Sequence, residues 1–174
     1  QAAAGGGATR TTVRSLARAQ SKLPGANLAL VSIPGEYAAA QAHHLLDAGL
    51  HVMLFSDNVT VADEASLKQR ARDLGLLVMG PDCGTAAFAG TALAFGNLTS
   101  PGSIGVVGAS GTGTQEVMVQ IDRLGAGVSQ AIGLGGRDLS EQIGGGTCLQ
   151  ALAALDADPA TDTIVIVSKP PAPQ

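Results

Sequence analysis

Short apolar runs and helical patterns alternate along most of this chain, and this alternation restricts the fold more than any other feature of the sequence. Apolar runs typical of buried strands occupy residues 28–33, 52–55, 76–79, 104–107, 128–134 and 164–167. Several of the segments between them carry apolar residues at helical spacing and end in a glycine. Near-continuous Val, Ile and Leu strands joined by helices are typical of parallel sheets covered on both faces. The sequence therefore predicts an α/β fold.

The order strand, helix, strand, helix, strand occurs twice, which predicts two incomplete parallel-sheet units. Residues 1–22 read as a lead-in rich in Ala and Gly followed by a short helix, 23–100 as the first unit and 103–174 as the second. Small residues replace any long helix between 82 and 102, where 91–95 can form a short strand or one arm of a hairpin. Because the chain starts without Met and stops in a Pro-rich run, we expect it to be part of a longer protein.

The composition excludes several classes of partner. With no Trp, one Tyr and three Phe, the chain has too few aromatic residues for the stacking platforms that bind single-stranded nucleic acid. A net charge of -4 argues against binding to nucleic-acid backbones or anionic membranes, and no apolar run approaches the roughly 18 residues of a spanning helix. Cys83 and Cys148 lack the spacing of metal ligands, so no metal site is predicted, and they favour a reducing compartment such as the cytoplasm.

A loop of Gly, Ser and Thr follows the strand at 104–107 and leads into a helix. It contains the candidates Gly108, Ser110, Gly111, Thr112, Gly113 and Thr114. Small residues let backbone N–H groups face a ligand, and the start of a helix adds partial positive charge, so a phosphate or carboxylate suits this loop. The lysine of an ATP P-loop and the spacing of a dinucleotide loop are both missing. A tight turn with a Ser or Thr cap is the structural alternative.

Two further loops follow predicted strands and supply candidates for substrate binding. These candidates are Pro81, Asp82, Gly135, Gly136, Arg137 and Asp138. Arg137 can hold a carboxylate in a bidentate manner, and Asp138 can orient Arg137 or accept a hydrogen bond from a substrate amide. Alternatively, Arg137 and Asp138 pair with each other at the surface. Asp82 can equally bond its own backbone in an Asx turn.

These loops resemble the pattern of the succinyl-CoA synthetase alpha subunit, and most closely its FdrA branch. The runs FSDNVT, LLVMGPDCGT, GASGTG, AIGLGGRDLS and VSKPPA are FdrA-like and cover most of residues 23–172. The resemblance implies that the first unit is the later part of a Rossmann-like CoA-binding-type domain and the second the beginning of a flavodoxin-like ligase domain. It also implies that Phe55, Ser56 and Asp57 contact CoA, and that Gln115 replaces a tyrosine near the acid substrate.

The same resemblance implies an acyl-CoA synthetase-like subunit that binds a phosphorylated acyl or carbamoyl compound and works with partner subunits or as a homo-oligomer. CoA is its possible cofactor. The FdrA branch is also associated with carbamoyl transfer between carbamoyl phosphate and oxamate in allantoin degradation, where Gly111 and Thr112 would hold the phosphate and Arg137 the oxamate. A non-catalytic binding or assembly module is the remaining alternative. The family's amino-terminal CoA loop and phosphohistidine segment are not among these residues, so we expect this chain alone to be inactive.

Overall fold

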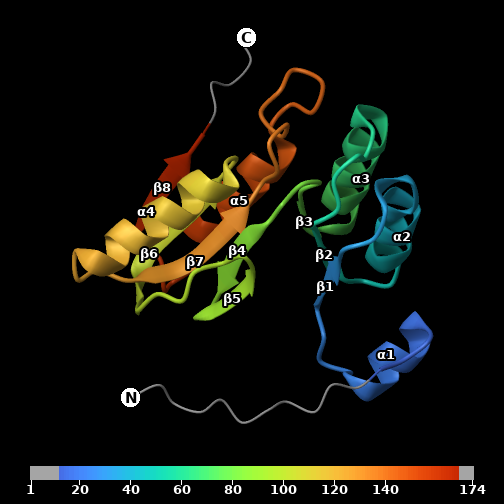
Figure 1. Ribbon diagram of the computed structural model, residues 1–174, viewed down its shortest axis with the longest axis horizontal. Coiled ribbons are helices and arrows are strands. Elements are labelled where there is room, and N and C mark those ends of the chain that lie inside the picture. Colours follow the sequence, from blue (N-terminus) through green and yellow to red (C-terminus); the bar gives the residue numbers. More distant parts are fainter. Residues whose placement is uncertain (1–11, 169–174) are drawn as a thin grey trace.

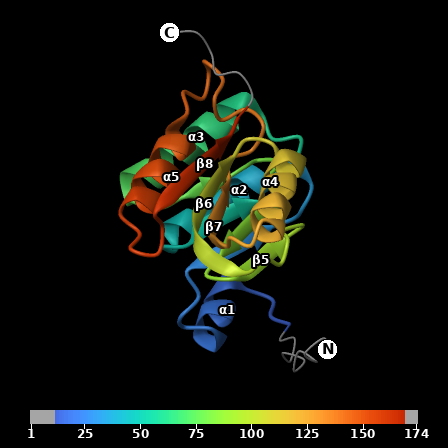
Figure 2. The same cartoon turned by 90° about the vertical axis from the view of Figure 1, so that its left-hand side faces the viewer.

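The computed structural model describes residues 12–168, whose strands form two sheets lying side by side (Figures 1 and 2). The lead-in predicted at the amino terminus lies largely outside the described residues, whereas the short helix forms α1 (Leu16–Lys22). No helix within the described range is long and apolar enough to cross a membrane. The predicted fold class, two α/β units built on parallel strands, is confirmed.

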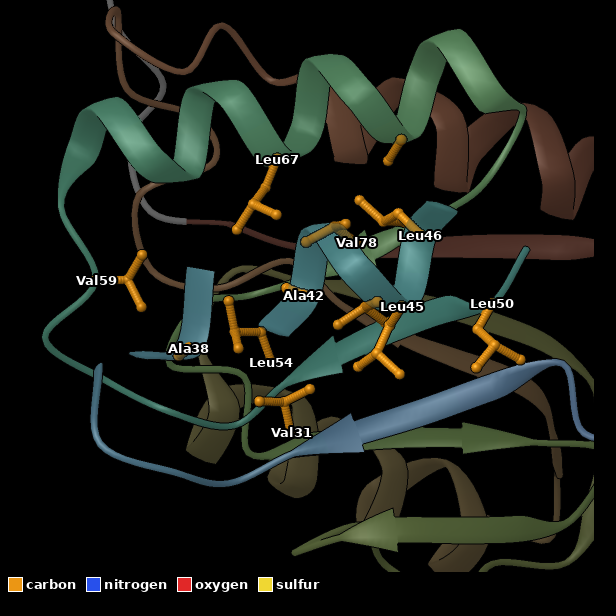
Figure 3. Close-up of a cluster of buried hydrophobic side chains, with 12 residues drawn as sticks. Val31, Ala38, Ala42, Leu45, Leu46, Leu50, Leu54, Val59, Leu67 and Val78 are labelled. Carbon is orange, nitrogen blue, oxygen red and sulfur yellow. The ribbon is translucent and has the colours of Figure 1, made fainter. Parts of the chain in front are cut away.

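The first sheet is parallel and packs on both of its faces. Its unit consists of β1 (Leu28–Val31), α2 (Gly35–Asp47), β2 (His51–Leu54), α3 (Val61–Leu74) and β3 (Val78–Met79), with the strands in the order β1-β2-β3. Both helices cover one face, where Leu46, Leu54 and Leu67 belong to a buried apolar cluster (Figure 3). Successive strand residues point to opposite faces, so Met53 and Met79 join the core of the second unit instead. The second unit therefore covers the face that the helices leave open.

The second sheet combines parallel strands with an antiparallel hairpin. Its unit consists of β4 (Thr85–Phe88), β5 (Thr91–Ala94), β6 (Pro101–Gly108), α4 (Gly111–Arg123), β7 (Val128–Gly133), α5 (Gly146–Asp156) and β8 (Thr163–Val167). The strand order is β5-β4-β7-β6-β8, in which β7, β6 and β8 are parallel. Met118 of α4 packs in one apolar cluster of this sheet, and Leu155 of α5 in the other.

The hairpin formed by β4 and β5 belongs to the second sheet. The sequence order predicts that these residues belong to the first unit, residues 23–100. In the structure β4 pairs antiparallel with β7, with Ala87 opposite Ala131 and Phe88 opposite Gln130. The polypeptide therefore enters the second sheet directly after the turn that follows β3.

His51, at the start of β2, lines a cavity of about 420 Å³ at the amino ends of the first sheet's strands. Its Nδ1 accepts a hydrogen bond from the backbone N–H of Leu77 at 3.0 Å. Burial lowers the pKa of the His51 imidazole below its ordinary 6.5. The folded protein therefore holds this ring neutral in a pH range where the unfolded chain begins to protonate it.

We expect the free energy of unfolding to decrease as the pH falls below 6.5, because the unfolded state then binds more protons at His51 than the folded state does. Above that pH the ring is neutral in both states, so its contribution is constant. Urea unfolding between about pH 7 and pH 5 checks this. His51→Gln should flatten the pH dependence. Identical slopes in the wild type and His51→Gln would refute the expectation.

Candidate functional site

A cavity of about 640 Å³ lies where the carboxyl ends of the first sheet's strands face the start of α4. We call it the carboxyl-end cavity. It is lined by Ser32, Ile33, Pro34, Phe55, Ser56, Asp57, Asp82, Gly84, Thr85, Phe95, Gly111, Thr112 and Gln115. The turns after β1 and β2 form one wall, and the first turn of α4 forms the other. The cavity therefore brings together the candidates after β2, Asp82 and the candidates at the start of α4.

The candidate residues at the start of α4 have two roles: some cap the helix, and others present free backbone amides to the cavity. The Ser110 hydroxyl caps the helix by accepting from the Gly113 N–H at 3.3 Å, and the Ser110 carbonyl accepts from Thr114 Oγ1 at 2.7 Å. The first amides of a helix have no intrahelical acceptor, and those of Gly111 and Thr112 lie at the cavity. Together with the positive end of the helix dipole, they can hold an anion or a polarised carbonyl oxygen.

Other candidates shape the loops without lining the carboxyl-end cavity. A side chain at Gly108 would collide with Thr114, so this glycine lets β6 pass directly beside the first turn of α4. Gly135 has a φ of +79° and packs against the carbonyl of the buried Pro81. Gly136 is half-buried in the same loop. These positions contribute to the shape of the site through the backbone.

The opposite wall carries the exposed carboxylates of Asp57 and Asp82, and hydrogen bonds fix the turns to which they belong. The buried Ser56 hydroxyl accepts from the Ile33 N–H at 3.0 Å and donates to a β1 carbonyl, so it joins the turns after β1 and β2. The Asp82 N–H donates to the Ser56 carbonyl at 3.0 Å. Within residues 12–168, neither the Asp57 nor the Asp82 carboxylate has a hydrogen-bond or salt-bridge partner. Both are therefore available to a ligand with N–H or O–H donors.

Phe95, which follows the hairpin, joins the two walls and was missed by the sequence analysis. Its ring packs edge-on against that of Phe55, with 5.3 Å between centroids and 66° between planes. Gln115 Nε2 donates to the Phe95 carbonyl at 2.6 Å, which fastens the hairpin to α4. An aromatic residue at the end of the predicted hairpin arm 91–95 was the available signal, in a chain with only three Phe. Gln115 thus anchors a lining residue and keeps its carbonyl oxygen and its second amide N–H for a ligand.

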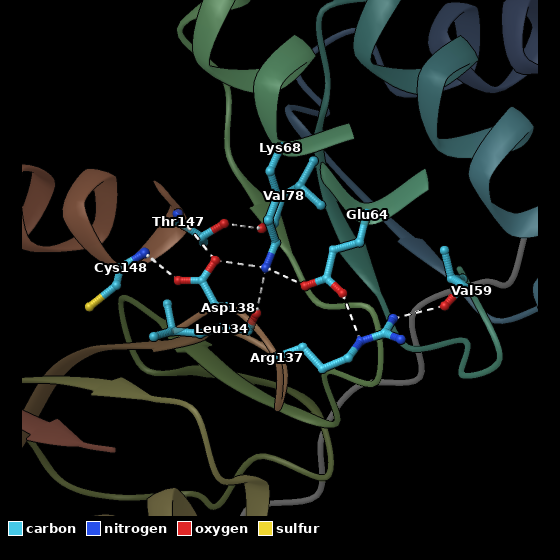
Figure 4. Close-up of polar contacts among 9 residues, drawn as sticks. All are labelled: Val59, Glu64, Lys68, Val78, Leu134, Arg137, Asp138, Thr147 and Cys148. Carbon is cyan, nitrogen blue, oxygen red and sulfur yellow. Dashed lines mark hydrogen bonds and ion pairs between the residues drawn. The ribbon is translucent and has the colours of Figure 1, made fainter. Parts of the chain in front are cut away.

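Arg137 and Asp138 lie in a polar network between the two units instead (Figure 4). Lys68 Nζ donates to Glu64 Oε1 at 2.8 Å, to Asp138 Oδ1 at 2.7 Å and to the Leu134 carbonyl at 3.2 Å. The side chains of Lys68, Glu64 and Asp138 are at most 1% exposed. We call Glu64, Lys68, Arg137 and Asp138 the Lys68 network. Its contacts join α3 of the first unit to the loop after β7 of the second.

The side chains of Arg137 and Asp138, which were expected to hold a substrate, make protein contacts within and next to the Lys68 network. Arg137 Nε donates to Glu64 Oε2 at 2.9 Å, and Arg137 Nη2 donates to the Val59 carbonyl at 2.8 Å. Asp138 accepts from the N–H groups of Thr147 and Cys148 at the start of α5, at 3.3 and 2.9 Å. Arg137 and Asp138 neither pair with each other nor line the carboxyl-end cavity. This corrects the expectation that both face a ligand beside the Gly, Ser and Thr loop.

The cysteines do not behave as reactive groups. Burial is the main cause that raises the pKa of the Cys83 thiol to about 11, and burial also raises that of Cys148. A thiol of this kind is protonated near neutral pH, whereas the nucleophile is the thiolate. Within residues 12–168, no three His, Cys, Asp or Glu side chains gather in a way that could hold a metal ion.

Comparisons with known proteins relate the sequence to CoA ligases. Residues 99–174 match the CoA binding domain family, so this match falls on the second unit, whereas the resemblance placed the CoA-binding-type domain at residues 23–100. YahF of Escherichia coli (strain K12), described as an uncharacterized protein, is 55% identical over 91% of this chain and 31% of its own length. The alpha 2 subunit of ADP-forming succinate–CoA ligase from Archaeoglobus fulgidus is 28% identical over 83% of this chain and 50% of its own. The chain thus spans about a third of YahF and half of that subunit.

Solved structures share the fold. ATP citrate lyase from Methanothrix soehngenii, solved in complex with citrate and coenzyme A, superposes with a TM-score of 0.75 over 87% of this chain and 26% of its own. Dinucleotide-forming acetyl-coenzyme A synthetase 1 from Ca. Korarchaeum cryptofilum gives 0.63 over 84% and 32%. Both are 21% identical to this chain, so these likenesses concern the fold alone.

Proposed function

Since this chain is homologous to succinate–CoA ligase alpha subunits and to the FdrA-like protein YahF, we propose that it forms the ligand-holding part of an acyl-CoA synthetase-like subunit. In this proposal, an acyl group and the thiol end of CoA lie in the carboxyl-end cavity. The observation that carries the proposal is the cavity itself. It joins the turn from Phe55 to Asp57, which the resemblance assigns to CoA, to the amides of Gly111 and Thr112, which suit an anion.

The charges of the lining favour the pantetheine arm of CoA over its nucleotide end. Asp57 and Asp82 present carboxylates, and the described lining residues include no Lys, Arg or His. Phosphate groups placed beside these carboxylates would be repelled. The pantetheine arm is neutral, and its amide N–H groups can donate to Asp57 and Asp82. We therefore place the arm in the cavity and the phosphorylated adenosine outside it.

The acyl end would lie against the start of α4. The N–H groups of Gly111 and Thr112 can donate to a thioester carbonyl or to the phosphate of an acyl phosphate. Negative charge develops on the carbonyl oxygen when an acyl group is transferred, and donors that are already in place stabilise it. The rings of Phe55 and Phe95 provide an apolar surface for the carbon chain.

This chain would hold and orient its reactants. Among the described lining residues there is no cysteine, histidine or lysine, and the nearby Cys83 is a protonated thiol near neutral pH. We propose that any side chain that carries a phosphoryl group comes from another segment or from a partner subunit. Partner subunits are an expectation from relatives that are themselves named as subunits.

Gly111→Val should weaken the binding of S-acetylpantetheine and acetyl-CoA by about tenfold or more, because the new side chain would occupy the cavity. A Cβ atom at Gly111 would meet only Thr85 Oγ1, at 3.8 Å, so the fold can accept the substitution. Isothermal titration calorimetry gives the affinities, and thermal unfolding verifies that the variant is folded.

Gly25→Val is the matched control, because a Cβ atom there has nothing within 4 Å and the position lies outside the cavity lining. It should bind both ligands like the wild type. Equal affinities for Gly111→Val and the wild type would contradict the proposed site. Binding of carbamoyl phosphate or oxamate without binding of any CoA derivative would favour carbamoyl transfer, and binding of none of these compounds would favour an assembly module.

A further inference from the structure

Arg137 is connected to the wall of the carboxyl-end cavity that carries Asp57. Its Nη2 donates to the carbonyl of Val59, two residues after Asp57, at 2.8 Å. Its Nε donates to Glu64 Oε2 at 2.9 Å, near the start of α3. The loop between β2 and α3 is thereby tied to the loop after β7, as Figure 4 shows.

Lys68 extends this connection to the wall formed by α4. Besides Glu64 and Asp138, its ammonium group binds the Leu134 carbonyl at 3.2 Å. The Leu134 N–H in turn donates to the carbonyl of Gly108 at 2.8 Å. Gly108 ends β6, two residues before the Ser110 cap of α4. Polar contacts joined by short backbone segments therefore connect the Asp57 wall to the start of α4.

We infer that Arg137 is a positioning residue that fixes the separation of the two walls of the carboxyl-end cavity. Glu64, to which Arg137 donates, and Lys68, which pairs with Glu64, are each 1% exposed and are fixed by several contacts, whereas Arg137 is 43% exposed. Arg137 is thus the link that can be removed without leaving a large buried cavity. A ligand that touches both walls depends on their separation, whereas a ligand held only by the α4 amides does not. This dependence on ligand size rests on the proposed function.

The first test needs no ligand. Arg137→Met retains an apolar stem but cannot donate to Val59 or Glu64. Because a hydrogen bond from a charged donor is worth roughly a tenfold change in an equilibrium constant or more, the amides of Asp63 and Glu64, which donate to Thr60, should exchange with deuterium about tenfold faster or more. Arg70→Met is the matched control. Arg70, like Arg137, forms an ion pair that involves α3, but its partner is the exposed Asp47, at 2.7 Å. Unchanged exchange of the Asp63 and Glu64 amides in Arg137→Met would overturn the inference.

The second test compares two ligands of different reach. S-acetylpantetheine can touch both walls, whereas acetyl phosphate fits the amides of Gly111 and Thr112 alone. In Arg137→Met the affinity for S-acetylpantetheine should fall about tenfold while that for acetyl phosphate stays within about twofold. Arg137→Lys should fall between the wild type and Arg137→Met, because a lysine can still reach one of the acceptors.

The outcomes separate this inference from the proposed function. Equal losses for both ligands in Arg137→Met would overturn the inference, because the effect would then not depend on whether a ligand touches both walls. If the wild type binds neither ligand, the proposed function fails, and the exchange rates of the Asp63 and Glu64 amides still decide whether Arg137 positions the wall.

Discussion

Lys68→Met should lower the free energy of unfolding by about 3–5 kcal/mol, the typical effect of removing one partner from a buried ion pair. Lys68 is 1% exposed, and its ammonium group binds Glu64, Asp138 and the Leu134 carbonyl. Without it, the fully buried Asp138 keeps only two backbone N–H donors, and the Leu134 carbonyl loses a donor inside the protein. Neither group can recover its hydration without opening the contact between the units.

Urea unfolding followed by circular dichroism measures this effect. Arg70→Met removes a positive charge from the same helix, but Arg70 and Asp47 are 45% and 55% exposed, so its unfolding curve should stay near that of the wild type. Because Lys68 joins α3 to the second unit, the transition of Lys68→Met should also become less cooperative. A variant that unfolds at the same urea concentration as the wild type would show that water already reaches the network.

Gly135→Ala should cost about 2–5 kcal/mol, which combines the strain of a left-handed backbone with overpacking. Gly135 has a φ of +79°, and a Cβ atom there would collide with the Pro81 carbonyl and lie 2.9 Å from Gly80 Cα. These are backbone atoms, which a rotamer change cannot move aside. The glycine that the sequence analysis assigned to a substrate loop is therefore required for packing the two units together.

Gly125→Ala provides the matched control for this prediction. Gly125 has a φ of +78°, but a Cβ atom there would have nothing within 4 Å, so only the backbone strain of about 1–2 kcal/mol applies. The difference between the two variants in chemical denaturation isolates the collision with Pro81. Equal losses would mean that the loop after β7 can shift away from Pro81 at little cost.

The sequence allowed the architecture to be predicted where local pattern and burial agree. Strand β2 is buried over Val52, Met53 and Leu54, so it reads as a continuous apolar run that differs clearly from the amphipathic helices around it. The hairpin of β4 and β5 could not be assigned to a sheet in this way. Its strands have four residues each, and the pairing of β4 with β7 depends on contacts more than 40 residues apart.

The candidate site was predictable to the extent that it follows from the ends of strands. Loops after parallel strands meet at one edge, which is why Asp57, Asp82 and Gly111 share a cavity. The role of Arg137 was not predictable, because its acceptor Glu64 is 73 residues away in the sequence. Glu64 and Lys68 have the spacing of a solvated helix pair, and only coverage by the second unit makes them buried.

The central claim is that the carboxyl-end cavity holds the acyl and thiol end of an acyl-CoA between its two walls. A titration of isotope-labelled protein with S-acetylpantetheine, followed by backbone amide chemical shifts, tests it most directly. We predict that the amides of Asp57 and Asp82 shift together with those of Gly111 and Thr112 and saturate with a single Kd. Shifts confined to the second cavity around His51 and Leu77, or their absence at Gly111 and Thr112, would contradict the claim.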